Sequence, residues 1–326
     1  MKVYQATDSI SSFRRAVITI GTFDGVHVGH QQVITQLKQE ARRIDGETVI
    51  ITFHPHPRKV VATDKPTLHL INTIEEKIEL LAKNGIDHLV IVPFTKEFSS
   101  LTPQEYIERF LIARFHPHTV IIGYDHRFGK GRLGDYTLLE QYSETGAFEL
   151  KEIPAHIINE NTVSSTLIRE AVLKGDIHTA NHLLGYDFFF EGVVVEGNKL
   201  GRTLGYPTAN LQVENEEKLI PSNGIYAVQA TIGNRQQAIG NNSPLTTDNS
   251  LLNGMMSIGV RPTIDASSTT RVIEVNLFDF SESIYGQTLR VFVKKYLRAE
   301  EKFNGLDALV AQIGRDKEEA LKVLRG

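Results

Sequence analysis

The sequence predicts two domains of different fold class: an α/β domain built on a parallel sheet, followed by a mostly antiparallel β domain that ends in a helix. The first half alternates short apolar runs with helical patterns, which is typical of a parallel sheet with helices on both faces. From residue 188 onward, five apolar runs follow one another between turn residues, and one helical pattern returns at 306–324. With 326 residues, the chain can hold two domains of ordinary size.

Each element of the first half follows from its own pattern. Apolar runs rich in β-branched residues predict the strands Val17–Ile20, Thr48–Phe53, His88–Val92 and Val120–Gly123. Helical spacing predicts the helices Gln31–Arg43, Thr73–Asn84 and Pro103–Phe115. Thr73 and Glu76 have the spacing of a capping box. Because parallel strands end at one edge of a sheet, the segments that follow residues 20 and 53 are expected to converge.

The second half is predicted to consist of strands separated by Gly, Asn, Pro and Ser. The expected strands are Phe188–Val195, Tyr226–Ile232, Met256–Val260, Arg271–Phe278 and Leu289–Tyr296. The domain boundary is expected near residues 183–187, so that the domains are residues 1–184 and 185–326. The segment Gly233–Leu252 is rich in Asn, Ser, Thr and Gly and is expected to form a long loop or a β-excursion.

Composition and charge exclude several function classes. The balance of 35 basic and 39 acidic residues gives a net charge of -4, which argues against a dedicated surface for nucleic acid but not against small phosphorylated ligands. The sequence has no cysteine, which excludes disulfides, thiolate nucleophiles and cysteine-bound metals. No run reaches the ~18 apolar residues of a membrane helix, and the N-terminus has no apolar signal core. We therefore expect a cytoplasmic protein that binds neither nucleic acid nor membrane.

The segment GTFDGVHVGH at residues 21–30 carries the strongest chemical signal. It follows a predicted strand and precedes a predicted helix, where backbone N–H groups and the helix dipole favour anions. His27 and His30 can hydrogen-bond phosphate oxygens there and stabilise the charge that develops during group transfer. Asp24 fits a turn cap as well as direct participation. The alternative for the whole segment is a polar turn whose histidines are satisfied caps.

Three further segments support a nucleotide site in the first half. TFHPHPRK at 52–59 places two histidines and two prolines after a strand. GYDHRFGKGR at 123–132 places an acid, an arginine and three glycines after another predicted strand. Glycine permits the close approach of a ligand to the backbone. SSTLIR at 164–169 offers hydroxyls and Arg169 at a predicted helix N-terminus. The respective alternatives are a rigid turn, a surface loop and a capping motif.

The segment GNKLGRTLGYPTANL at residues 197–211 supports a second phosphate site. Its glycines allow the backbone to wrap closely around phosphate. Pro207 fixes the chain before Thr208 and Asn210, whose uncharged side-chain oxygens suit a Mg²⁺ ion that keeps waters and nucleotide oxygens. The segment is not a Walker A loop, because G-x-x-x-x-G-K-[ST] is absent. The alternative is a glycine-rich hairpin with a proline turn.

These strings resemble two known enzyme families. GTFDGVHVGH resembles the H-x-G-H signature of the nucleotidyltransferase superfamily, in the form typical of bacterial bifunctional riboflavin kinase/FAD synthetases. Residues 197–211 resemble the G-R-x-L-G-x-P-T-A-N motif of riboflavin kinases, and PSNGIY (221–226), IGVRPT (258–263), RVIEVNLFDF (271–280) and IYG (284–286) are similar to further segments of them. The resemblance implies a Rossmann-like nucleotidyltransferase domain and a six-stranded β-barrel riboflavin kinase domain.

The resemblance also implies the two reactions. The β domain would convert riboflavin and ATP into FMN and ADP, and the α/β domain would convert FMN and ATP into FAD and pyrophosphate. Mg²⁺ or another divalent cation would accompany ATP, and the flavins would be substrate and product. The protein would have ATP, riboflavin, FMN and FAD as ligands and would be a monomer or a weak homo-oligomer.

Residue roles follow from the same resemblance. The catalytic residues would be His27, His30 and the general base Glu274, and the metal ligands would be Thr208 and Asn210. Glu274 lies between Ile273 and Val275, which face the other side of the strand, so alternation alone does not place it in a site. The ATP- or phosphate-binding residues would be Gly21, Phe23, Asp24, Gly29, Ser164, Ser165, Thr166, Arg169, Gly197, Gly201, Arg202, Gly205 and Pro207. The flavin-binding residues would be His56, Pro57, Asp125, Phe128 and Arg261.

This chain departs from the family pattern at two positions. His126 stands where relatives usually have Phe, and Ser257 stands where Asn usually precedes the IGVRPT segment. Two other functions remain open. One is an H-x-G-H transferase that acts on another phosphorylated or carboxylated substrate. The other is a flavin-binding regulatory protein without turnover.

The two reactions differ in what they demand of the protein. The phosphate of FMN is already ionised near neutral pH, so the first half needs charge stabilisation more than a base. An alcohol needs its proton removed during phosphoryl transfer, so the second half needs a carboxylate such as Glu274.

Overall fold

The computed structural model describes residues 1–5, 10, 12–61, 68–123, 126–153, 163–197, 200–233, 251–262 and 269–325. The chain divides into two compact units, Met1–Ser165 (unit 1) and Thr166–Gly326 (unit 2). The helices α9 (Ser165–Lys174) and α10 (Ile177–Leu184) therefore fall largely within unit 2, where α10 contacts a strand of the barrel described below. The functional boundary after residue 184 stays a prediction.

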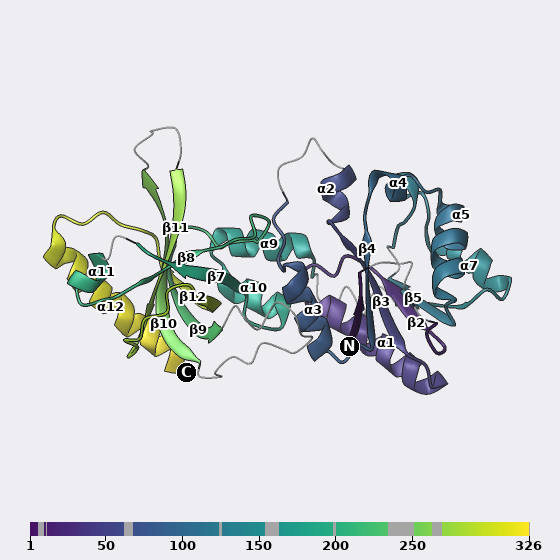
Figure 1. Cartoon of the computed structure of the whole chain (residues 1–326), viewed down its shortest axis with the longest axis horizontal. Coiled ribbons are helices and arrows are strands. Elements are labelled where there is room, and N and C mark those ends of the chain that lie inside the picture. The colour runs from purple at the N-terminus through teal and green to yellow at the C-terminus, as the bar shows by residue number, and fades with distance from the viewer. Residues whose placement is uncertain are drawn as a thin grey trace. The chain divides into compact units, whose positions relative to one another are not determined.

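The described strands of unit 1 form one parallel sheet in the order β1-β4-β3-β2-β5-β6 (Figure 1). Four of them were predicted from the sequence. The edge strands β1 and β6 were not, because β1 has only three residues and β6 alternates charged with apolar residues. The strands are β1 (Lys2–Tyr4), β2 (Val17–Ile20), β3 (Thr48–His54), β4 (His88–Pro93), β5 (Thr119–Gly123) and β6 (Glu149–Ile153).

The strand order of unit 1 reverses at β2. The strands β3 and β4 extend the sheet on one side of β2, and β5 and β6 extend it on the other. In parallel sheets of this kind, ligands bind outside the carboxyl ends of the strands at the point of reversal. The segment 21–30 follows β2, and the segment 123–132 overlaps the end of β5. Two of the segments that support a nucleotide site in the first half therefore start at the reversal point.

The three expected helices of unit 1 are present with two differences, and further helical segments at 57–61, 96–99, 130–132 and 136–144 were not expected. The first helix, α1, starts at Val28 rather than Gln31, because His27 caps it. The span 103–115 is helical throughout, but its middle is a π-helix. The predicted capping box of Thr73 and Glu76 is confirmed. The helices are α1 (Val28–Ile44), α2 (Pro57–Val61), α3 (Ile74–Lys83), α4 (Lys96–Ser99), α5 (Pro103–Glu105), η2 (Tyr106–Ile112), α6 (Ala113–Phe115), η3 (Lys130–Arg132) and α7 (Tyr136–Glu144).

Helical segments cover both faces of the sheet, as predicted. Ile18, Ile51 and Val120, each fully buried, lie on one face and share a core with Tyr106 and Phe110 of the π-helix. The helix α1 contacts β2, β3 and β5 through residues outside that core, so it covers the opposite face. The layers thus leave the carboxyl edge of the strands open for the loops that carry the candidate site.

The described strands of unit 2 form a closed antiparallel barrel in the order β10-β11-β8-β7-β12-β9. This confirms the six-stranded barrel, including β8, which the sequence pattern did not reveal because it has only four residues of mixed polarity. The strands are β7 (Phe189–Val195), β8 (Ala209–Gln212), β9 (Gly224–Gly233), β10 (Leu252–Pro262), β11 (Thr269–Leu277) and β12 (Thr288–Arg298). The expected loop or β-excursion at 233–252 lies almost entirely outside the described residues.

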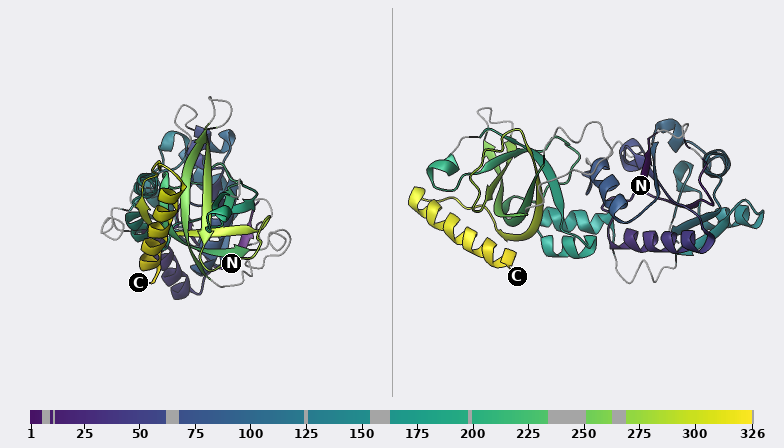
Figure 2. Two further views of the ribbon diagram at one scale, coloured as in Figure 1. Left: turned by 90° about the vertical axis from the view of Figure 1, so that its left-hand side faces the viewer. Right: turned by 60° about the horizontal axis from the view of Figure 1, so that its bottom comes forward.

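A long C-terminal helix completes unit 2. This helix, α12 (Leu306–Arg325), packs along β9, β10 and β12, as Figure 2 shows. A short helix, α11 (Leu200–Thr203), precedes β8. In the described part of the chain, no helix has both the length and the apolar character needed to cross a membrane.

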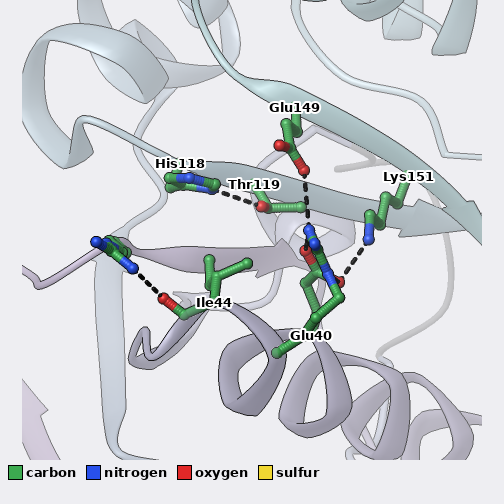
Figure 3. Close-up of polar contacts among 8 residues, drawn as sticks. Glu40, Ile44, His118, Thr119, Glu149 and Lys151 are labelled. Carbon is green, nitrogen blue, oxygen red and sulfur yellow. Dashed lines mark hydrogen bonds and ion pairs between the residues drawn. The ribbon is translucent and has the colours of Figure 1, made fainter.

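A buried carboxylate anchors α1 to the edge of its sheet. Glu40 of α1 is only 6% exposed and accepts hydrogen bonds from Arg43 Nε (3.0 Å), Arg43 Nη2 (2.7 Å) and Lys151 Nζ. Arg43 also pairs with Glu149, which lies on β6 like Lys151 (Figure 3). The hydrogen bonds from Arg43, and then those from Lys151, lower the pKa of Glu40 to about 2. The helix that His27 caps is thereby held to β6 near its other end.

Replacing Glu40 is therefore expected to destabilise unit 1. Glu40→Gln should lower the free energy of unfolding by about 2 kcal/mol at pH 7, since each unit of pKa shift corresponds to about 1.4 kcal/mol and Gln keeps part of the hydrogen bonding. The pKa of Glu40 is lower in the folded state, so its contribution is present above pH 4.5 and is lost as the pH falls towards about 2. Amide hydrogen exchange of α1 and β6 measures the effect within unit 1.

Glu79→Gln is the matched control for Glu40→Gln. Glu79 pairs with Lys83 on the surface of α3, where the lysine side chain is 68% exposed. Such exposed pairs contribute about 0.2–1 kcal/mol. An equal effect of the two substitutions would contradict the anchoring role of Glu40.

Candidate functional site

The turn between β2 and α1 has an unusual backbone. Phe23, Gly25 and Val26 have φ values of +47°, +94° and +38°. Positive φ is costly for Phe and Val, so the surrounding contacts must hold the turn in place. One such contact joins the turn to the neighbouring strand, since the N–H of Gly21 donates to the Ile51 carbonyl at 3.0 Å.

The turn places the two predicted histidines against each other. The rings of His27 and His30 are stacked with their centroids 3.6 Å apart, and Phe23 lies 4.8 Å from His30. His27 caps α1, because its Nδ1 accepts from the N–H of His30 at 3.4 Å. Gly29 between them is buried, and a side chain there would press on the His27 ring.

His30 is suited to hydrogen bonding rather than to carrying charge. Burial lowers its pKa well below the usual value, and the nearby His27 and Lys77 lower it further. Its ring is therefore neutral at pH 7. The Nδ1 atom of His30 is buried and has no hydrogen-bond partner among the described residues. A neutral imidazole with an unused polar atom at a helix N-terminus suits the oxygens of a phosphate.

Asp24 holds the turn to neighbouring segments. Its carboxylate is 1% exposed and accepts from the N–H groups of Ile71 (3.0 Å) and Asn72 (3.3 Å). Its backbone carbonyl accepts from the Ser165 hydroxyl at 2.9 Å. These contacts favour the turn-holding role for Asp24. They also place Ser165, predicted to bind phosphate, at the turn.

Sequence reasoning missed Lys77, which contributes to the same turn. Lys77 of α3 is 6% exposed, and its Nζ donates to the Thr22 carbonyl at 2.7 Å. Burial lowers its pKa to about 8, against the opposing effect of Asp24. A signal was present, because Lys77 interrupts the apolar face formed by Ile74 and Ile78.

The remaining predicted residues of the first half are less closely gathered. His56 is 8% exposed beside the end of β3, and its Nδ1 accepts from the N–H of Arg58 at 3.2 Å; Pro57 begins α2. Asp125 lies outside the described residues. Ser164 precedes α9, and Thr166 and the largely buried Arg169 lie on that helix within unit 2.

Phe128 belongs to the core of unit 1. Its ring is 5% exposed and stacks on Tyr106 with the centroids 5.0 Å apart. Gly134 pairs with it, and a side chain at 134 would overlap the Phe128 ring. The neighbouring His126, which replaces the usual Phe, lies 5.8 Å from the Phe128 ring. Phe128 therefore supports the loop that follows β5, irrespective of its predicted contact with a flavin.

In unit 2, strand register brings the predicted catalytic and metal residues together. Glu274 of β11 lies directly opposite Asn210 of β8. The Thr208 hydroxyl donates to Glu274 Oε2 at 3.3 Å. Ile273 and Val275 are buried, as expected for the opposite face of the strand. The three side chains thus form one cluster of oxygen and amide groups, which we call the Glu274 cluster.

The Glu274 cluster lines a cavity of about 570 Å³, here called cavity A. The rest of the lining mixes apolar residues with charged ones such as Glu300 and Glu301. The apolar residues include Met255 and Met256 of β10 and, on α12, Leu306, Leu309 and Ile313, which recur at helical spacing. Sequence reasoning did not connect this face of α12 with a site. Further lining residues are Tyr206, Met255, Met256, Ser257, Arg298, Phe303 and Asp316.

A second cavity of about 350 Å³, cavity B, lies on the other side of the same segment. Pro207, Thr208 and Ala209 line it together with Ile284 and Tyr285 of the IYG segment. Thr208 lines both cavities. A group bound in cavity A and a group bound in cavity B would therefore meet at Thr208.

The glycines before β8 are required by close contacts. A side chain at Gly197 would collide with Asn210, and one at Gly201 would collide with the Tyr206 carbonyl. The following turn is closed by Gly205, at φ +81°, and the Pro207 carbonyl accepts from Asn276 Nδ2 at 2.6 Å. The side chains of Arg202 and Arg261 lie outside the described part of the chain.

The donor set of the Glu274 cluster suits a hard cation held jointly with a substrate. Within the described residues, no group of three or more His, Asp or Glu side chains could hold a metal ion alone. The hydroxyl of Thr208, the amide oxygen of Asn210 and the carboxylate of Glu274 are the oxygen ligands that Mg²⁺ prefers, with phosphates and water completing its shell.

Comparisons with known proteins match both halves of the chain. A family model described as FAD synthetase matches residues 9–167, and one described as riboflavin kinase matches residues 184–324. The bifunctional riboflavin kinase/FMN adenylyltransferase of Listeria monocytogenes is 37% identical over 93% of this chain and 90% of its own. That of Bacillus subtilis is 35% identical over 94% and 92%. A crystal structure described as a macrolide-efflux protein from Streptococcus pneumoniae superposes with a TM-score of 0.84, at 30% identity over 97% of both chains.

The core position of Phe128 leads to a stability prediction. Phe128→Ala should destabilise unit 1 by about 3–5 kcal/mol, because it removes a large buried ring that packs on Tyr106. Thermal unfolding followed by far-UV circular dichroism measures this, since the chain has no tryptophan. Phe98→Ala serves as a comparison at a half-buried aromatic of the same unit. Unchanged stability of Phe128→Ala would show that the ring is not part of the core.

Proposed function

Because the chain belongs to the family of bifunctional riboflavin kinase/FMN adenylyltransferases, we propose that each half performs one of the two reactions at the cluster described for it. Unit 2 phosphorylates riboflavin to FMN at the Glu274 cluster. The histidine turn of unit 1, with Ser164, Ser165, Thr166 and Arg169 after it in the chain, adenylylates FMN to FAD. The observation that carries this proposal is the contrast between the two clusters. One has two stacked histidines at a helix N-terminus, and the other has a carboxylate beside a hydroxyl and an amide.

In the kinase reaction, cavity A holds riboflavin and cavity B holds ATP. The apolar lining of cavity A, with Met255, Met256 and Phe303, suits the flat flavin ring, and Arg261 contributes to flavin binding. Gly197, Gly201, Arg202, Gly205 and Pro207 form the loop that covers the ATP phosphates. The meeting of both cavities at Thr208 supports direct transfer between the two substrates.

Glu274 acts as the general base of the kinase. It takes the proton from the ribityl hydroxyl as that oxygen attacks the γ-phosphorus of ATP. The bond between the γ-phosphorus and the bridging oxygen breaks, and ADP leaves. Thr208 and Asn210 hold the divalent cation, which supplies charge neutralisation on the phosphates. The hydrogen bond from Thr208 keeps the carboxylate of Glu274 beside the reacting hydroxyl.

In the adenylyl transfer, a phosphate oxygen of FMN attacks the α-phosphorus of ATP and pyrophosphate leaves. The nucleophile is already an anion, so the protein provides positioning and charge stabilisation. His27 and His30 donate hydrogen bonds to the phosphates, and Gly21, Phe23, Asp24 and Gly29 shape the turn around them. Ser164, Ser165, Thr166 and Arg169 hold the triphosphate. His56, Pro57, Asp125 and Phe128 form the flavin side.

The proposed enzyme also has an expected cellular compartment and oligomeric state. It acts in the cytoplasm, where both nucleotide and vitamin are dissolved, as a monomer or a weak homo-oligomer. The net charge of -4 is consistent with small phosphorylated ligands rather than with nucleic acid.

Incubation of the purified chain with riboflavin, ATP and Mg²⁺ tests both activities at once. Chromatography over time should show FMN that appears first and then gives way to FAD. FMN alone would contradict the role of the histidine turn. The absence of any product would contradict both roles and favour a flavin-binding protein without turnover.

Replacing Glu274 is expected to separate the two activities. Glu274→Gln should lower kcat of riboflavin phosphorylation by about 10²–10⁴-fold, the usual contribution of a general base. Adenylylation of supplied FMN by the same sample should be unchanged, which serves as the internal control. Retained phosphorylation in Glu274→Gln would assign the base to another group.

Replacing the histidines is expected to impair adenylylation and to leave riboflavin phosphorylation unchanged. His27→Asn and His30→Asn should each lower adenylylation by about 10²–10³-fold, the cost of removing one donor to a transition-state oxygen, so that FMN accumulates. His116→Asn is the matched control, because His116 is exposed and Asn tolerates its left-handed backbone. Equal losses in the control and in the two variants would contradict the assignment.

A further inference from the structure

Lys77 is a buried cation beneath the histidine turn that neither proposed reaction uses. Its Nζ lies 2.7 Å from the Thr22 carbonyl, and the side chain is 6% exposed. Burying an ammonium group is unfavourable unless it is well hydrogen-bonded, and a long apolar side chain at this position of α3 would continue the apolar face. Packing alone therefore does not explain why this buried position carries a lysine.

The Thr22 carbonyl is the point at which three elements meet. It accepts from Lys77 of α3 and, at 3.1 Å, from the hydroxyl of Thr52 on β3. Thr22 directly precedes Phe23, the first residue of the turn in the left-handed region. The direction of this carbonyl fixes the peptide plane from which the turn departs. Lys77 and Thr52 thus hold the start of a turn whose backbone is costly by itself.

We propose that Lys77 is a positioning residue for FMN adenylylation, which holds the Thr22 carbonyl and thereby orients the stacked pair of His27 and His30. This inference rests on the proposed role of the two histidines. Lys77 does not need to touch a substrate, because its effect passes through the backbone of residues 22–26. Asp24 of the turn also accepts hydrogen bonds from the N–H groups of Ile71 and Asn72, just before α3. The turn and the region of α3 are therefore joined by contacts that start from both segments.

The charge of Lys77 also acts on His30. The charged or titratable groups that interact with it are Asp24 of the turn and His30 of α1, which in turn stacks on His27, and Glu76 precedes it on its own helix. Glu76 is engaged in the capping box at Thr73. Asp24 favours the charged form of Lys77, and Lys77 in turn disfavours protonation of His30. Lys77 thus helps to keep His30 neutral, the form that accepts or donates hydrogen bonds without a fixed charge.

The test compares Lys77→Met and Lys77→Arg with a matched control in the full chain. Met removes the charge and the donor at similar volume, and Arg retains both. Lys83→Met makes the same substitution on the same helix, where the lysine side chain is 68% exposed and pairs with Glu79. Riboflavin phosphorylation, which takes place at the Glu274 cluster of unit 2, is measured in each sample as an internal control.

The expected result is a selective loss of turnover. Lys77→Met should lower kcat of adenylylation by about 10- to 100-fold, the range for a displacement of catalytic groups by up to about 1 Å, with KM for ATP and FMN close to wild type. Lys77→Arg should recover most of the activity, and Lys83→Met should match wild type. Adenylylation by Lys77→Met at the wild-type rate, a change in KM alone, or an equal loss in Lys83→Met would overturn the proposal.

The pH profile separates positioning from a merely structural role. Without the positive charge of Lys77, the pKa of His30 should rise, so the acidic limb of kcat against pH should move to higher pH in Lys77→Met and stay in place in Lys77→Arg. A loss of equal size at every pH would contradict the action of the Lys77 charge on His30. If Lys77→Met loses the helical circular dichroism signal of the native chain, Lys77→Gln, which keeps a donor without the charge, replaces it in the pH measurement, where the same shift of the acidic limb is expected.

His30→Asn in the same assay distinguishes this inference from the site assignment on which it rests. A loss in His30→Asn without a loss in Lys77→Met would overturn the role of Lys77 alone. Wild-type adenylylation in both variants would overturn the assignment of the histidine turn itself.

Discussion

The parallel pairing of β2 with β3 on one side and β5 on the other is the constraint on which the first half depends. Because these strands are parallel neighbours, the carboxyl ends of β3, β2 and β5 lie at the same edge of the sheet. The turn after β2 then needs a backbone that Phe23 and Val26 adopt only under support from neighbouring segments. That support comes from side chains on β3 and α3 that converge on a single carbonyl.

Unit 2 solves a different chemical problem with a different element of structure. An antiparallel register, rather than a shared sheet edge, sets Asn210 opposite Glu274 and leaves Thr208 within reach of the carboxylate. The two halves therefore suit different nucleophiles. Imidazoles stacked at a helix N-terminus suit an attacking anion, whereas a carboxylate in a strand suits an attacking alcohol.

Local signals predicted much of the fold, and contacts distant in sequence account for what they missed. The capping box at Thr73 and the strand ends beside the histidines depend on neighbouring residues, so the sequence was sufficient for both. The burial of Lys77 depends on a carbonyl 55 positions away, and the pairing of Glu274 with Asn210 depends on register. The register leaves no periodic pattern, and Lys77 leaves only an interruption of an apolar helical face. The edge strands β1 and β6 escaped prediction because short or half-exposed strands carry few apolar residues.

Cavities A and B share Thr208 as a common wall, which has a consequence for molecules designed against the chain. A partition that is one side chain thick can be crossed by a short linker. A single compound with one part in each cavity would bind more tightly than either part alone. Once the first part is bound, the second part is held at a high effective concentration beside its cavity. Its selectivity would rest on both sets of lining residues at once, whereas a ligand of either cavity alone depends on one set.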